Sequence, residues 1–127
     1  MRDDVVAVYL TFPDEAVAER IARLLVAQRL TACVNLLPAA RSVYRWEGEV
    51  RMEPEVVGIA KTSTDRVAAL AEAVRSAHPF DLPCVVAYPA VGGLAPYLAW
   101  VVEETRPEPP AAAARSGSLP GDGEAPS

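Results

Sequence analysis

The stretch from Thr31 to Thr62 constrains this fold most, because it reads as two long strands joined by a turn. β-Branched and aromatic residues lie on both sides of a Gly-containing turn at Glu47–Glu49, a pattern typical of a β-hairpin. Pro38 and Pro54 each lack a ladder donor, so we expect a bulge, a bend or a free edge at each. Each arm of about fifteen residues would extend roughly 50 Å.

The predicted hairpin is too long for the rest of the chain to cover. The sequence predicts two main helices, and a helix of about sixteen residues spans only about 24 Å. The far end, which carries Val43, Tyr44, Trp46 and Val50, would therefore stay exposed. An exposed apolar hairpin aggregates unless something pairs with it, and the simplest partner is a second copy of the chain. We therefore predict an obligate oligomer built through the hairpins.

Hydrophobic periodicity and Pro and Gly punctuation predict the remaining elements. They are a strand at Val5–Phe12, an amphipathic helix from Pro13 to about Arg29, a helix capped by Ser63 or Thr64 that stops at His78, a strand at Cys84–Tyr88 and a final helix after Gly93. This order predicts an α+β fold of the ferredoxin-like split βαβ type, β-α-β-β-α-β plus a C-terminal helix. Both main helices would cover one face of an antiparallel sheet, which leaves the other face to the last helix or to other subunits.

The composition changes near the C-terminus. Residues 107–127 have no aromatic residue and are rich in Pro, Ala, Gly and Ser, so we predict a disordered tail. Residues 1–106 are predicted to form one domain.

Charge and cysteine content exclude several classes of protein. The net charge of −5 argues against binding to nucleic acid, because no basic patch is available to release counterions. No apolar run approaches the roughly 20 residues of a membrane span, and the start lacks the features of a signal peptide. Two cysteines do not make a disulfide framework, so we expect free thiols and a cytoplasmic location.

Five short segments occur together in an order typical of one family. They are Ala32–Pro38, Ser42–Gly48, Lys61–Thr62, His78–Phe80 and Tyr97–Trp100. Together they resemble the CutA-type divalent-cation-tolerance proteins. The resemblance implies a ferredoxin-like homotrimer whose subunits pair edge to edge, and a link to tolerance of copper and other divalent metals. It implies no catalytic reaction. The architecture is also similar to the PII signalling trimers, which bind small molecules between subunits.

Three residues are candidate metal ligands. A thiolate at Cys33 and an imidazole at His78 suit copper or zinc, and the resemblance implies that both match copper-binding positions of the family. A third family position corresponds to Leu10, which cannot ligate. Cys84 stands where the family has Glu, and it would add a soft ligand or simply remove a carboxylate. The alternative is structural: Cys33 as a small buried hydrophobe, and His78 as a helix-end residue.

Lys61, Trp46 and Tyr97 are candidate ligand-binding residues. Lys61 is a lone cation at the end of an apolar strand beside a helix start, where it could hold a carboxylate or phosphate in a cleft between subunits. Alternatively Lys61 pairs with Glu55 or extends to solvent, and the aromatic residues pack in the core and between subunits.

The leading hypothesis is a cytoplasmic homotrimer of divalent metal tolerance that binds metal ions, copper above all, without turnover. The alternative is a PII-like trimer that senses a small molecule or anion, or a structural interaction trimer. Catalysis has little support, because the sequence has no Gly-rich phosphate loop, no HExxH, no CxxC and a single His. No organic cofactor is predicted.

Overall fold

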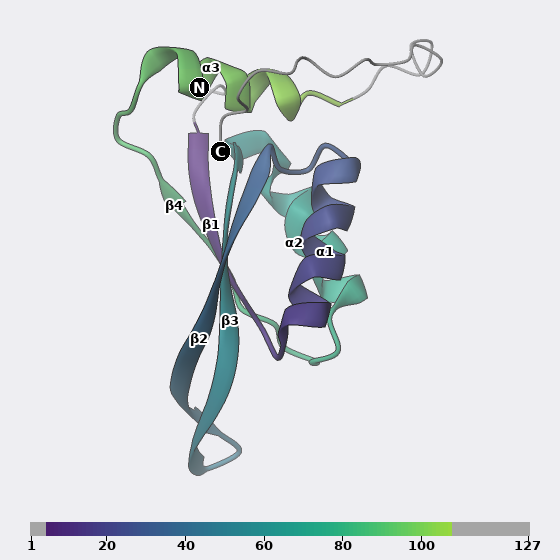
Figure 1. The fold of residues 1–127 in the computed structure, drawn as a ribbon, viewed down its shortest axis with the longest axis vertical. Helices are drawn as coiled ribbons and strands as arrows, with labels where there is room; N and C mark the ends of the chain where they lie inside the picture. Colours follow the sequence, from purple (N-terminus) through teal and green to yellow (C-terminus); the bar gives the residue numbers. More distant parts are fainter. Residues whose placement is uncertain (1–4, 108–127) are drawn as a thin grey trace.

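The computed structural model describes residues 5–107, and Figure 1 shows their arrangement. In chain order the elements are β1 (Val5–Phe12), α1 (Glu15–Ala27), β2 (Cys33–Trp46), β3 (Glu49–Ser63), the 3₁₀ turn η1 (Thr64–Arg66), α2 (Val67–Ala77), β4 (Val85–Pro89) and α3 (Ala95–Glu104). The predicted tail lies, apart from its first residue, outside this range.

The four strands form one antiparallel sheet in the order β2-β3-β1-β4. Helices α1 and α2 lie side by side over one face of it (Figure 1). The core lies between these two layers and contains Leu10, Phe12, Ile21, Leu25 and Leu70, all fully buried. The α+β prediction, with both main helices on one face, is therefore confirmed.

Helix α1 begins and ends through specific capping contacts. The Asp14 carboxylate accepts a hydrogen bond from the Val17 amide at 2.9 Å, which satisfies one of the donors left open at a helix N-terminus. At the other end, Arg29 has a φ of 60°. The Leu30 amide donates to the Leu25 carbonyl and the Arg29 amide to that of Val26, which is the Schellman arrangement. The helix therefore stops two residues before the predicted end.

Ser63, one of the two residues predicted to cap α2, does not cap it through its side chain. A 3₁₀ turn at Thr64–Arg66 precedes the helix, and the Ser63 side chain makes no capping bond. The Ser63 hydroxyl instead lies 2.7 Å from the hydroxyl of Thr105, at the end of α3. Ser63 is buried, so its hydroxyl serves the contact between β3 and α3 rather than the helix start.

The hairpin pairs β2 with β3 from Cys33 opposite Lys61 to Trp46 opposite Glu49. Its two-residue turn has φ of 51° at Glu47 and 83° at Gly48. Two positive φ values in succession are what a tight hairpin turn of the right twist requires. Figure 1 shows the turn end of β2 and β3 extending past the ends of α1 and α2.

The two prolines of the hairpin mark different irregularities. The pairing shifts by one residue between Leu37 and Ala40, so Pro38 lies in a bulge. Pro54 lies within β3 opposite Arg41, beyond Val56, which is the last residue of β3 that pairs with β1. At Pro54 the second edge of β3 therefore has no neighbouring strand within the part of the chain that the structure describes.

The sheet face opposite α1 and α2 is apolar and largely open. Tyr9, Leu37, Val86 and Tyr88 are 38, 45, 45 and 55% exposed, and the strand register places them all on this face. Among the elements of residues 5–107, only α3 crosses this face, at one end of the sheet (Figure 1). Among residues 5–107, no helix combines the length and the apolar character that crossing a membrane requires.

Candidate functional site

Lys61 is held on the open face of the sheet by two neighbours. Its ammonium donates a hydrogen bond to the side-chain oxygen of Asn35 at 2.6 Å. The same nitrogen lies 5.8 Å from the centre of the Tyr97 ring, within the range of a cation–π contact. Lys61 is half-buried at the end of β3 nearest α3. Its ammonium group therefore lies at the end of the open face that α3 covers.

Cys33 and Tyr97 complete this cluster. The thiol of Cys33, opposite Lys61 in the register, lies 3.4 Å from the Tyr97 hydroxyl. Burial, together with the neighbouring Cys33, raises the pKa of Tyr97 well above its usual value, so the phenol keeps its proton at neutral pH. The Tyr97 and Trp100 rings lie 5.5 Å apart on α3. Cys33, Asn35, Lys61, Tyr97 and Trp100 are called the Lys61 cluster below.

The position of α3 depends on Arg29. Its guanidinium donates at 2.9 Å to the carbonyl of Glu103, in the last turn of α3, and at 2.8 Å to the carbonyl of Arg106, which follows the helix. The Ser63–Thr105 contact fixes the same end. Tyr97 therefore reaches the sheet because the loop after α1 and the end of β3 hold the C-terminus of α3.

Trp46 lies far from the other two candidate ligand-binding residues. It is the last residue of β2, and Cys33 beside Lys61 is the first. Thirteen residues of extended strand span about 43 Å. One chain thus brings Lys61 and Tyr97 together but does not bring Trp46 to them.

His78 follows α2 and is only 8% exposed. Its Nε2 lies 2.9 Å from the Thr11 carbonyl oxygen, and its Nδ1 accepts a hydrogen bond from the Phe80 amide at 3.1 Å. The imidazole also contacts two rings, with centroids 5.9 Å away at Phe12 and 5.0 Å away at Phe80. Both ring nitrogens are therefore occupied by backbone partners.

Cys84 immediately precedes β4 and is half-buried. Its thiol lies 3.9 Å from the Tyr9 carbonyl oxygen. Burial raises the pKa of this thiol, the Glu55 carboxylate raises it further, and a bond to Thr11 opposes them. The Glu55 carboxylate accepts a hydrogen bond from the Ser42 hydroxyl at 2.6 Å. Cys84 is thus a thiol whose surroundings disfavour the metal-binding thiolate.

The candidate metal ligands do not converge in one chain. Cys33 and Cys84 are separated by three strand spacings and about four residues along the strands, roughly 14 Å across and 13 Å along the sheet. Among residues 5–107, no three His, Cys, Asp or Glu side chains form a group that could hold a metal ion. Leu10, at the third family position, is fully buried. The residues of one chain therefore do not fit a closed metal centre.

Asn35 is the site residue that the sequence reasoning missed. Alternation along β2 could have placed it beside Cys33, on the same face. Its hydrogen bond to Lys61 depends on the bulge. If the strand register were continued from the turn without a bulge, Lys61 would lie opposite Val34, and the Lys61 and Asn35 side chains would lie on opposite faces of the sheet.

The model of the family "CutA1 divalent ion tolerance protein" matches residues 6–104. Mouse Protein CutA is 46% identical over 101 residues, which is 80% of this chain and 57% of the mouse protein. The Divalent-cation tolerance protein CutA of Thermus thermophilus is 44% identical over 98 residues, which is 77% of this chain and 95% of that protein.

Solved structures agree with the fold. The Thermus thermophilus Cut A1 structure has a TM-score of 0.79 at 42% identity and covers 80% of this chain and 99% of its own. The CutA1 structure from Oryza sativa has a TM-score of 0.80 at 38% identity and covers 83% and 96%. The chain spans less than two thirds of the vertebrate relatives it matches, but nearly all of the bacterial one. On the match to the family model and these identities, the chain belongs to the CutA1 divalent ion tolerance family.

Proposed function

We propose that this chain acts in tolerance to divalent metal ions, as a homotrimer that binds metal without catalytic turnover. Membership of the CutA1 family supports the metal role. The structural observation that carries the assembly is the uncovered hairpin, on which Val43 and Val50 are each 67% exposed. Both cysteines are free, which supports a cytoplasmic location.

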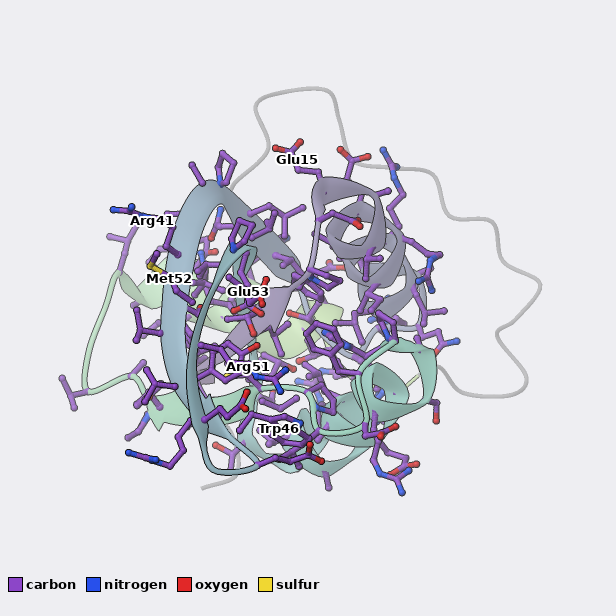
Figure 2. The ribbon with its side chains drawn as sticks, turned by 90° about the horizontal axis from the view of Figure 1, so that it is seen from below. Glu15, Arg41, Trp46, Arg51, Met52 and Glu53 are labelled. Carbon is purple, nitrogen blue, oxygen red and sulfur yellow. The ribbon has the colours of Figure 1, made fainter. Side chains whose placement is uncertain are left out.

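The hairpin offers a partner both an apolar surface and strand edges. Val43, Val50 and Met52 lie on one side of it, which Arg45 shares opposite Val50, and Met52 is 59% exposed. Figure 2 shows Met52 pointing away from α1 and α2. On the same part of β3 the edge beyond Val56 is unpaired within residues 5–107. A second copy that covers the apolar side and adds a strand at the edge would satisfy both.

The proposed metal ligands are the thiols of Cys33 and Cys84, with His78 as the residue that the family resemblance implies. Copper suits such soft ligands. The thiols of Cys33 and Cys84 lie far apart in one chain. We therefore propose that metal ions bind weakly at the two thiols separately, or between thiols of different chains, and not in one closed centre within a chain.

Calorimetric titration with Cu(I), Cu(II) and Zn(II) tests this role. The wild-type protein is compared with Cys33→Ser/Cys84→Ser, and with Ser76→Ala on the exposed side of α2 as a control. We expect the double variant to lose at least tenfold in Cu(I) affinity and the control to match wild type. Equal affinities in all three proteins would refute the thiol sites.

A second candidate function is favoured by the Lys61 cluster. A cation held between an amide oxygen and an aromatic ring is suited to a small anion with a planar group. In an assembly, Trp46 of another copy could reach this end of the sheet, as the PII-like alternative requires.

Lys61 is the only lysine of the chain, which makes this candidate simple to test. Small carboxylates and phosphates are titrated while tryptophan fluorescence is followed. Binding that Lys61→Met abolishes and Cys84→Ser leaves intact would support an anion site separate from the metal role, because Cys84 lies outside the Lys61 cluster. Binding equal in wild type and Lys61→Met would exclude it.

A further inference from the structure

We infer that His78 is a structural residue in this chain, and that the chain does not bind metal ions through the His78 imidazole. We use the word latch for His78 together with its hydrogen bonds to Thr11 and Phe80. The inference refines the proposed metal role by removing one ligand, and it disagrees with the copper set that the family resemblance implies. It is carried by the two hydrogen bonds of the ring, by its burial and by the placement of the other ligands.

The hydrogen bonds fix the tautomer of the imidazole. The Phe80 amide is a donor, so Nδ1 must accept with its lone pair. The Thr11 carbonyl is an acceptor, so Nε2 must carry the proton. A metal ion binds an imidazole nitrogen through a lone pair, and in this arrangement neither nitrogen has one to offer.

Coordination would therefore require one of these bonds to break. Binding at Nδ1 would leave the Phe80 amide without its acceptor, and binding at Nε2 would displace the proton given to Thr11. The ring is 8% exposed and packed against Phe12 and Phe80, so water cannot easily replace either partner. The surroundings of the ring thus oppose ligation at both nitrogens.

The other members of the copper set lie elsewhere. His78 stacks on Phe12, which belongs to the core beneath the helices, whereas Cys33 lies on the open face of the sheet. Leu10 occupies the third position and is fully buried. No side-chain arrangement in one chain brings a second soft ligand of that set to the His78 ring.

The latch has a clear structural task. His78 begins the connection between α2 and β4, which Figure 1 shows passing from the end of α2 to the sheet. Its Nε2 bond ties this connection to Thr11 at the end of β1, and its Nδ1 bond to the Phe80 amide fixes the first residues of the connection, which continues to Cys84 and β4. His78 is therefore a positioning residue for Cys84 and for β4, one of the two edge strands of the sheet.

Nitrogen NMR of the wild-type protein tests the inference directly, because the chain contains one histidine and gives one set of ring signals. We expect a neutral ring protonated at Nε2, whose two nitrogen signals do not move when Zn(II) or Cu(I) is added in excess. A change of either nitrogen to a metal-bound signal on titration would overturn the inference.

Variants separate the latch from the metal role. In a Cys84→Ser background, His78→Phe keeps an aromatic ring but loses both bonds. We expect amide exchange in β4 to become at least tenfold faster while Cu(I) affinity changes less than twofold. Cys33→Ser in the same background is the matched control, and it should lower Cu(I) affinity while leaving β4 exchange unchanged.

The opposite pattern would refute the latch: a tenfold loss of Cu(I) affinity in His78→Phe with unchanged β4 exchange. If the wild type binds no metal, the proposed function fails, but the tautomer and the exchange rates still decide the role of His78. If His78→Phe does not fold, the wild-type titration alone decides it.

Discussion

At the scale of single residues, Cys84 shows how surroundings set the chemistry of a thiol. Burial is the larger cause of its raised pKa, and the Glu55 carboxylate adds to it. A raised pKa means a smaller fraction of thiolate at any pH below it, and only the thiolate reacts with alkylating agents.

We therefore predict slow alkylation of Cys84 by iodoacetamide. In Cys33→Ser, where Cys84 is the only thiol, the rate should keep rising beyond the pH at which free cysteine levels off. Glu55→Gln removes the carboxylate, which is the smaller cause of the raised pKa. The pH profile of the alkylation rate should therefore shift partway back toward that of free cysteine. A profile in Cys33→Ser that levels off at or below the pH of free cysteine would contradict the prediction.

Gly58 gives a second prediction at this scale. A Cβ added to it would lie 2.8 Å from Cε2 of Phe12, whose fully buried ring cannot move aside. Gly58→Ala should destabilise the protein by about 1–3 kcal/mol through overpacking, measured by chemical denaturation at fixed protein concentration. Gly92→Ala is the control, since a Cβ there meets nothing within 4 Å, and it should change stability by less than about 0.5 kcal/mol. Equal stability of the two variants would contradict this account.

The residues of the Lys61 cluster were only partly predictable. Lys61 and Tyr97 stand out in the sequence as a lone cation and an aromatic residue on a short apolar helix. The placement of Cys33 and Asn35 beside Lys61 depends on the bulge at Pro38, which sets which residues of β2 share the face of Lys61. A proline predicts an irregularity in a strand, but it does not say how many residues the register shifts.

At the scale of elements, Arg29 connects α1 to α3. It occupies the left-handed position of the Schellman motif, where Gly is the usual residue, at a cost of about 1–2 kcal/mol. Its guanidinium binds two carbonyls at the end of α3. The two hydrogen bonds of the Arg29 side chain offset the cost of its left-handed backbone conformation. This explains why an arginine can occupy a position where glycine is usual.

Arg29→Gly should separate these two effects. The relief of strain and the loss of two surface hydrogen bonds, each worth about 1 kcal/mol, should nearly cancel in overall stability. Amide exchange should nevertheless become faster in α3 and stay unchanged in α1. Arg23→Ala, on the exposed side of α1, is the control and should alter neither helix. Unchanged exchange in α3 of Arg29→Gly would show that the clamp does not hold the helix.

Most elements were predictable because their signals are local. Asp14 with Pro13 marks the start of α1, and the apolar run of β1 marks a strand buried in the sheet. The actual role of the Ser63 hydroxyl was not predictable in the same way, because a hydroxyl before a helix suits a long-range partner as well as a capping bond. Here that partner is Thr105, 42 residues away.

At the scale of the whole molecule, the surfaces left open are those that the account assigns to other copies. They are the open face of the sheet and the apolar side of the hairpin, which carries Val43, Val50 and Met52. Because α1 and α2 lie on the other face, α3 crosses one end of the sheet and the hairpin extends past the ends of α1 and α2 (Figure 1), nothing in residues 5–107 covers the rest of these surfaces.

Charges on the apolar side of the hairpin should therefore break the assembly. Val43→Glu/Val50→Glu would bury two carboxylates at the proposed contact, so we predict a smaller species in size-exclusion chromatography with helix content retained. Val26→Glu is the control, since Val26 is 44% exposed on α1 and lies outside the contact. Wild-type elution of Val43→Glu/Val50→Glu would place the contact elsewhere.

The most direct test of the central claim is the mass of the wild-type protein in sedimentation equilibrium at low micromolar concentration. The account predicts a single species of three times the 13.5 kDa chain mass, with no folded monomer at equilibrium beside it. A stable, fully folded species of 13.5 kDa at the same concentration would contradict it.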